Sequence, residues 1–165
     1  NEISKDFGGD NFEWSSSIEE RNRLWKARHD VYYAVKASRP KAEYIATDVC
    51  VPISRLSECI METIEDMETH KLYGPIVGHV GDGNFHVQLM VDPKIKEEVD
   101  TANAFLERLA HRAINMDGTC TGEHGVGQGK KQYLIDELGP AVDFMKLIKQ
   151  EIDPKGIMNP GKILQ

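Results

Sequence analysis

The predicted fold depends on one stretch, Val77-Gly78-His79-Val80-Gly81-Asp82-Gly83-Asn84-Phe85-His86-Val87-Gln88. It predicts two short strands joined by a tight turn at Asp82-Gly83, a dipeptide typical of β-hairpins. This register places His79 opposite His86, with Cβ atoms roughly 4.5–5.5 Å apart, so that the two imidazoles could share one ion. Alternation puts them with Gln88 on one face, away from the core. The expected core face carries Ile76, Val80, Phe85, Val87, Leu89 and Val91.

Composition is that of an ordinary globular domain. The chain has 165 residues, 40% hydrophobic and 28% charged, enough for one domain with its own core. A net charge of −7 without blocks of like charge argues against nucleic-acid binding, and no run approaches the ~20 apolar residues of a membrane span. Cys50, Cys59 and Cys120 are widely spaced and odd in number, so we expect free thiols in a reducing compartment.

The order of predicted elements gives the fold class. From residue 45 to 122 it is strand, helix, strand, strand, helix, strand. The predicted strands are 45–51, 76–80, 85–91 and 119–121, with one helix capped by Ser54 and another over 95–116. This is the ferredoxin-like βαββαβ pattern, an α+β fold whose antiparallel sheet has helices on one face. Extra N- and C-terminal helices are expected at 15–38, 130–138 and 140–152, a strand at 11–14 and a loop over 1–10.

A second chemical stretch is the glycine-dense loop 122–129, which carries Glu123 and His124. Two imidazoles and one carboxylate are a usual catalytic metal set that leaves positions open for substrate; zinc suits it, with manganese or iron as alternatives. His124 could then act as a base near neutral pH. The structural alternatives are a surface pair of histidines and a tight turn with a solvated acid. In the plain ferredoxin-like order, the loop must cross the sheet face for Glu123 to join His79 and His86.

Three motifs, Gly78–His86, Gly122–Gly127 and Asp153–Lys162, resemble the C-terminal domain of FAD-linked oxidases of the vanillyl-alcohol-oxidase type. Within this family the whole chain resembles the mitochondrial D-lactate dehydrogenases. The resemblance implies that residues 1–165 are a fragment, the substrate-side cap domain. The FAD would be bound mainly by an upstream FAD-binding domain that is absent from this chain, so the fragment alone is expected to be inactive.

The resemblance also implies a role for six residues. It gives the divalent-metal ligands as His79, His86 and Glu123, the base as His124, the substrate-carboxylate partner as Arg28 and a flavin-side residue as Asn159.

The implied reaction is oxidation of a D-2-hydroxy acid, such as D-lactate, to the 2-oxo acid, with a divalent metal (zinc or manganese) and hydride transfer to FAD. Relatives that act on 2-hydroxyglutarate have a lysine where this chain has Ala46, which favours a monocarboxylate here. Glycolate or D-2-hydroxyglutarate dehydrogenase and a non-catalytic ferredoxin-like metal-binding module are the alternatives. The resemblance further implies a mitochondrial location and cytochrome c or a quinone as electron acceptor.

Overall fold

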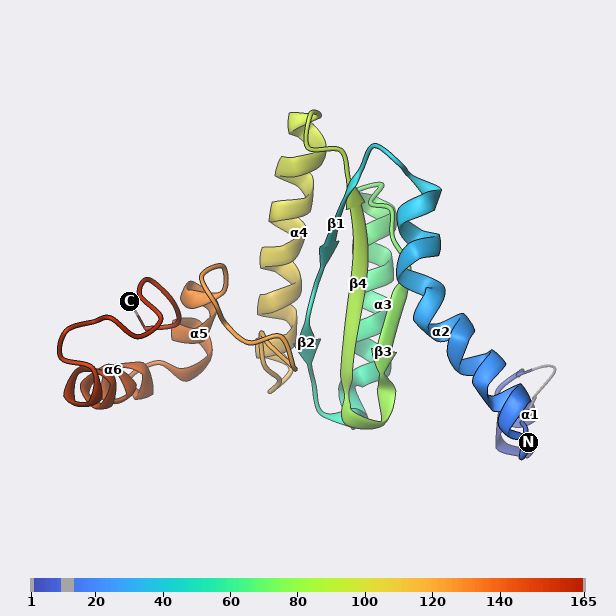
Figure 1. Cartoon of the computed structure of the whole chain (residues 1–165), viewed down its shortest axis with the longest axis horizontal. Helices are drawn as coiled ribbons and strands as arrows, with labels where there is room; N and C mark the ends of the chain where they lie inside the picture. Colours follow the sequence, from blue (N-terminus) through green and yellow to red (C-terminus); the bar gives the residue numbers. More distant parts are fainter. Residues whose placement is uncertain (1, 10–13, 165) are drawn as a thin grey trace. The chain divides into compact units, whose positions relative to one another are not determined.

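The computed structural model describes residues 2–9 and 14–164, in two compact units, Asn1–Ser38 and Arg39–Gln165. The first unit contains α1 (Glu2–Asp6) and α2 (Ile18–Ser38) (Figure 1). The loop predicted over 1–10 is therefore wrong at α1, whereas α2 confirms the predicted helix. Ser17 caps α2, because its hydroxyl accepts the backbone N–H of Glu20 at 3.1 Å. The strand predicted at 11–14 falls, apart from Trp14, outside the described residues.

The second unit is built on an antiparallel sheet of β1 (Glu43–Ala46), β2 (Val49–Cys50), β3 (Ile76–His79) and β4 (Asn84–Val91). The central strand β4 pairs with β1, β2 and β3. β1 and β2 keep one register against β4, so they form one strand interrupted at Thr47 and Asp48. The predicted strand at 119–121 is reduced to a single bridge between Thr119 and Cys50. With that bridge the sheet has the ferredoxin-like strand order, and the predicted α+β class is confirmed.

The hairpin differs from the prediction in its turn. Val80–Asp82 forms a 3₁₀ turn that ends at Gly83, so four residues connect β3 and β4 instead of two. His79 pairs with Asn84, and His86 pairs with Val77, so the predicted register is wrong by two residues. Val80 is consequently 62% exposed and does not join the core. A shift of two residues preserves the faces of the strands, so His79 and His86 are diagonal neighbours on one face.

Two helices, α3 (Ile53–Thr69) and α4 (Lys96–Asn115), cover the other face of the sheet (Figure 1). α3 begins one residue before the predicted cap, Ser54, and directly after Pro52. The core forms between these helices and the inward side chains of the strands. Its members include Val49, Phe85, Val87, Leu89, Val91, Leu56, Cys59, Met67, Ala102, Phe105, Leu109 and Ala113. The helices therefore cover one face of the sheet, and the histidines lie on the other face, where Asn84, His86 and Gln88 of β4 are also buried.

The chain continues beyond α4 through the glycine-dense loop into α5 (Lys131–Leu138) and α6 (Ala141–Ile152), which confirm the predicted C-terminal helices. Cys50, Cys59 and Cys120 are free thiols, as expected. Among the described residues, no helix combines the length and apolar character that a bilayer crossing requires.

Candidate metal centre

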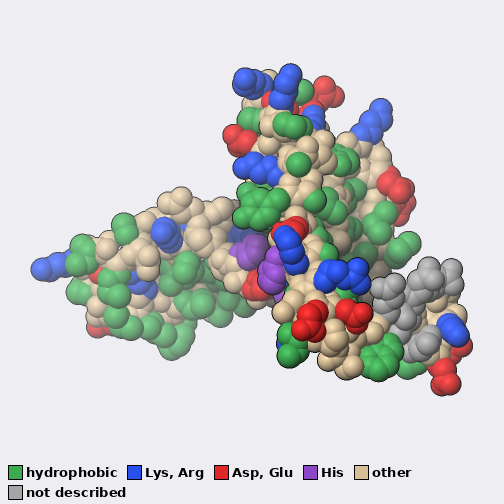
Figure 2. Space-filling model, turned by 45° about the vertical axis from the view of Figure 1, so that its right-hand side comes forward, with side chains coloured by type: hydrophobic (Ala, Val, Ile, Leu, Met, Phe, Trp, Pro, Cys, Tyr) green, Lys and Arg blue, Asp and Glu red, His purple; other side chains and the backbone are tan. Residues whose placement is uncertain are grey.

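His79, His86 and Glu123 come together on the face of the sheet opposite α3 and α4, where the exposed side chains of His79 and Glu123 meet the buried ring of His86. Nε2 of His86 lies 2.8 Å from Oε1 of Glu123, and Nε2 of His79 lies 3.8 Å from the same oxygen. One ligand atom from each of the three lies within 4.8 Å of the others. Figure 2 shows histidine side chains grouped at the surface with acidic side chains nearby. The loop that carries Glu123 thus crosses to the hairpin, and these three residues could hold one divalent ion.

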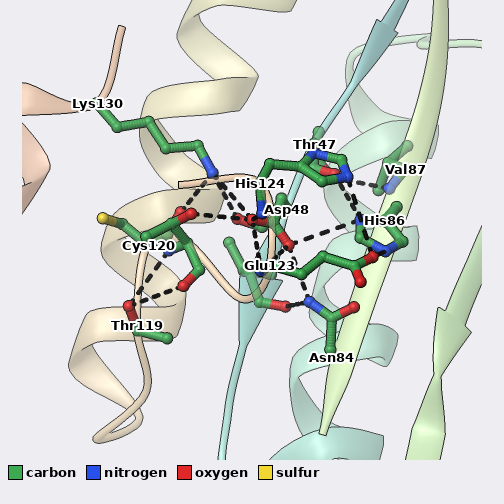
Figure 3. Close-up of polar contacts among 12 residues, drawn as sticks. Thr47, Asp48, Asn84, His86, Val87, Thr119, Cys120, Glu123, His124 and Lys130 are labelled. Atoms are coloured by element: carbon green, nitrogen blue, oxygen red, sulfur yellow. Dashed lines mark hydrogen bonds and ion pairs between the residues drawn. The ribbon is translucent and has the colours of Figure 1, made fainter. Parts of the chain in front are cut away.

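Asp48 holds that loop in place from the gap between β1 and β2. Its carboxylate is fully buried and accepts the backbone N–H groups of Glu123 at 3.1 Å and of His124 at 2.9 Å (Figure 3). It also accepts the Thr121 hydroxyl at 3.0 Å and Nδ2 of Asn84 at 2.9 Å. One carboxylate therefore ties the loop to the start of β4, beside the histidines.

Lys130 supplies the opposite charge beneath this loop. Its Nζ donates to the carbonyl oxygens of Asp48 and Cys120, both at 2.8 Å, and lies 3.6 Å from Oδ2 of Asp48. Burial alone would raise the pKa of Asp48, but the hydrogen bonds and the nearby Lys130 outweigh it and hold that pKa far below its ordinary value. Burial lowers the pKa of Lys130, partly offset by the charge of Asp48. Asp48 is therefore a fixed anion of the site.

The orientation of the His86 ring follows from its surroundings. Nδ1 lies 2.9 Å from the carbonyl oxygen of Thr47, which can only accept, so Nδ1 carries the proton. In the neutral ring, Nε2 then directs a lone pair at the Glu123 carboxylate, which is also an acceptor. Two acceptors at 2.8 Å need a cation or a proton between them. A backbone carbonyl is one of the partners that the second ring nitrogen of a metal-binding histidine ordinarily has, beside carboxylates and water.

His124 lies beside this cluster. Its ring stacks on that of His86 with centroids 4.9 Å apart and an interplanar angle of 10°. Asp48, His86 and His124 form a second group with the spacing of metal ligands. The oxygens of Asp48 already accept several hydrogen bonds, however, and Nδ1 of His86 faces Thr47. The geometry therefore favours His79, His86 and Glu123 as ligands and leaves the exposed His124 for another task.

Arg28 and Asn159 lie in other parts of the chain. Arg28 is exposed on α2, in the N-terminal unit, and its contact with a substrate carboxylate stays a prediction. Asn159 is exposed in the tail after α6, with a left-handed backbone (φ 46°). That tail folds back on the glycine-dense loop, since the N–H of Ile163 donates to the carbonyl oxygen of Gly127 at 2.7 Å. The predicted flavin contact of Asn159 also stays a prediction.

The sequence reasoning missed the supporting residues Thr47, Asp48, Asn84 and Lys130. A signal for the first two was present, because this polar pair interrupts the otherwise apolar strand predicted over 45–51. Buried polar residues in a strand need partners, which marks them as candidates for a site. Lys130 gave no such signal, since the start of a helix is ordinarily solvated.

Comparisons with known proteins place the chain in a family. The family model for FAD linked oxidases, C-terminal domain, matches residues 1–163. The chain is 53% identical to "Probable D-lactate dehydrogenase, mitochondrial" of Danio rerio, covering 99% of this chain and 33% of that protein. It is 42% identical to "D-lactate dehydrogenase [cytochrome], mitochondrial" of Arabidopsis thaliana, and the match covers 99% of this chain and 29% of that protein. It is 31% identical to "D-2-hydroxyglutarate dehydrogenase" of Stutzerimonas stutzeri, and the match covers 90% of this chain and 32% of that protein.

A solved structure supports the same fold. The 4-ethylphenol oxidase from Gulosibacter chungangensis matches with a TM-score of 0.57 at 16% identity, covering 90% of this chain and 31% of that one. The chain spans about a third of the length of the curated relatives it matches. With the family model matched over nearly its whole length, the chain belongs to the FAD-linked oxidases, as their C-terminal domain.

Proposed function

We propose that this chain is the substrate-side domain of a flavin-dependent D-2-hydroxy-acid dehydrogenase that oxidises D-lactate to the 2-oxo acid. The observation that carries the proposal is the convergence of His79, His86 and Glu123 on the sheet face opposite α3 and α4. The family match and the names of the relatives support the reaction class. The flavin would be held mainly by an upstream domain, as in the family that the sequence resembles.

The three residues fit a divalent ion, zinc or manganese. Ligand atoms about 2.0–2.2 Å from one tetrahedral zinc lie roughly 3.3–3.6 Å apart. The separations of 2.8 and 3.8 Å from Glu123 to the two imidazoles bracket that value. When bound, the ion would act as a Lewis acid that lowers the pKa of the substrate hydroxyl. His79, His86 and Glu123 would hold it and leave positions open for substrate oxygens.

The remaining residues would bind the substrate and move its proton. His124 is exposed next to His86, where it would take the hydroxyl proton. Arg28 would bind the substrate carboxylate through charge-assisted hydrogen bonds. When bound, FAD would supply the electron chemistry as the acceptor of hydride, and Asn159 would lie on the flavin side. These roles follow from the family resemblance, and the contact between His86 and His124 supports the first of them.

The substrate class follows from the residues beside the cluster. Ala46 pairs with Gln88 across the strands, next to His86, and neither residue carries a charge. A second carboxylate would gain no ion pair from either of them, which favours D-lactate or glycolate over D-2-hydroxyglutarate. The names of three relatives include both "cytochrome" and "mitochondrial". We propose the same location, with cytochrome c favoured over a quinone as electron acceptor.

Two substitutions in the full-length protein test the proposal. His86→Ala should remove metal and activity together while the protein still unfolds cooperatively, because the hydrophobic core lies on the opposite face of the sheet. Some loss in melting temperature is expected, since His86 is buried and its Nδ1 bonds to the carbonyl oxygen of Thr47. His124→Ala should retain the metal and lose about 100- to 10,000-fold in turnover, the usual contribution of a general base. Metal content, D-lactate oxidation and thermal melting are measured on both. Full metal occupancy in His86→Ala would mean that the histidines are only a surface pair.

A further inference from the structure

Asn84 lies next to two of the proposed metal ligands, His79 and His86. It is the first residue of β4, directly opposite His79 in the strand register and two residues before His86. Paired residues of antiparallel strands, and residues two apart on one strand, point to the same face of a sheet. The side chains of Asn84, His79 and His86 therefore share one face.

The orientation of the Asn84 amide is fixed by its nitrogen. Nδ2 donates to Oδ1 of Asp48 at 2.9 Å and to the carbonyl oxygen of Val49 at 3.0 Å. Both partners can only accept, so the amide cannot be rotated by half a turn without losing both bonds. Oδ1 must then point the other way, and Figure 3 shows it on the side of the Glu123 carboxylate.

This oxygen is buried and has no partner. Asn84 is 5% exposed, and its Oδ1 is one of two buried side-chain polar atoms without a hydrogen bond among the described residues. The other is Oε1 of Gln88, on the same face of β4. A buried polar atom left unsatisfied in a native fold indicates an ion, a water molecule or a ligand. An ionised Glu123 cannot satisfy the amide oxygen, because both are acceptors.

We propose that Oδ1 of Asn84 is a fourth protein ligand for the divalent cation held by His79, His86 and Glu123. This rests on the proposed function, and it adds a neutral oxygen to two imidazoles and a carboxylate. Amide oxygens are ordinary ligands of divalent cations that accept oxygen donors. Asp48 acts here as a positioning residue, because its hydrogen bonds orient both the Asn84 amide and the backbone that carries Glu123.

The first test is metal affinity. Metal-free full-length protein is titrated with Zn²⁺ or Mn²⁺ alone, in competition with a chelating dye. Asn84→Ala should raise the Kd about tenfold or more. Thr121→Val is the matched control, because it removes another hydrogen bond to Asp48 and no atom from the cation site. Its Kd should stay within about threefold of the wild-type value. Equal Kd values for Asn84→Ala and either the wild type or Thr121→Val would overturn the proposal.

A second variant keeps the test decisive if Asn84→Ala folds poorly. Asn84→Asp and Asn84→Ala both lose the amide hydrogen bonds to Asp48 and Val49, but only Asn84→Asp retains an oxygen for a cation. A cation ligand therefore predicts tighter metal binding, and a larger rise in melting temperature on metal addition, in Asn84→Asp than in Asn84→Ala. Equal rises in the two variants would mean that Asn84 serves only as a donor to Asp48, which would contradict the proposal. If the wild type binds the metal ion, His86→Ala does not, and Asn84→Ala binds it with unchanged Kd, then only the role of Asn84 is refuted. Absence of wild-type binding refutes both proposals.

Discussion

Ala46 is the residue at which the proposed substrate preference can be reversed. It pairs with Gln88, two residues from His86, so a long side chain at position 46 would extend over the face that carries the proposed site. Ala46→Lys would give a distal carboxylate a charge-assisted partner. We expect kcat/KM for D-2-hydroxyglutarate, relative to D-lactate, to rise about tenfold or more, the equivalent of one hydrogen bond to a charged group.

Ala46→Met separates charge from size, because it has similar length and no cation. Both variants are measured in the full-length protein with the two substrates. A ratio that is unchanged in Ala46→Lys, or raised equally by Ala46→Met, would show that position 46 does not face the distal end of the substrate.

The hairpin is the element that positions the site, and its turn depends on Gly83. Gly83 has a positive φ of 77°, and a Cβ atom there would lie 2.0 Å from the carbonyl oxygen of Val51. Gly83→Ala should therefore lower the free energy of unfolding by about 2 kcal/mol or more, since left-handed strain and a clash with backbone combine. Denaturant unfolding of the full-length protein measures this.

Gly81→Ala is the control within the same turn. No heavy atom lies within 4 Å of a Cβ added at Gly81, so its effect should stay within about 0.5 kcal/mol. If the free energy of unfolding falls by a similar amount in both variants, the loss comes from turn flexibility and not from the contact with Val51.

The same hairpin shows what the sequence could and could not predict. Alternation identified which face carries His79 and His86, because that pattern has a period of two. A register shift of two residues leaves the pattern unchanged, so alternation could not distinguish the observed pairing from the predicted one. The turn is also held by a distant contact, since the N–H of Val51 donates to the carbonyl oxygen of Gly83 at 3.0 Å. Rules that relate turn type to the residues of the turn do not predict a hydrogen bond to a residue so far away in the sequence.

The support of the site was hidden for a similar reason. Asp48 bonds to Asn84 and His124, which lie 36 and 76 residues further along the chain. The fold class and the residues that converge as candidate ligands could be predicted, because motif and element order are local or sequential features. The buried network depends on which strands become neighbours, and that became visible only in the folded structure.

At the scale of the whole second unit, α3 and α4 are joined by a buried carboxylate. Asp66 on α3 is 8% exposed and accepts Nη2 of Arg108 at 2.6 Å and Nη2 of Arg112 at 2.8 Å, both from α4. Burial by itself raises the pKa of Asp66, but the two arginines outweigh it and hold the pKa below its ordinary value. The ionised form of Asp66 therefore stabilises the packing of the helices that cover the sheet.

The pH dependence of stability follows from the lowered pKa of Asp66 in the folded protein. A carboxyl group whose pKa is lowered by folding stabilises the protein fully above its unfolded pKa of about 3.9 and loses this effect as the pH falls through the folded value. Asp66→Asn should lower the free energy of unfolding by about 2–3 kcal/mol at pH 7, a discounted value because Arg108 is partly exposed. The difference from wild type should shrink below pH 4.

Glu62→Gln is the matched control for Asp66→Asn. Glu62 is half-exposed and its Oε2 lies 3.3 Å from Nε of the same Arg112, so its loss should cost less than about 1 kcal/mol. Urea unfolding of the full-length wild type, Asp66→Asn and Glu62→Gln is measured at pH 7, 5 and 3.5, which gives the free energy of unfolding against pH for each protein. A difference between Asp66→Asn and wild type that is the same at pH 7 and 3.5 would contradict an ionised Asp66. Packing of the amide between the helices would then account for the loss, because packing, unlike charge, does not titrate.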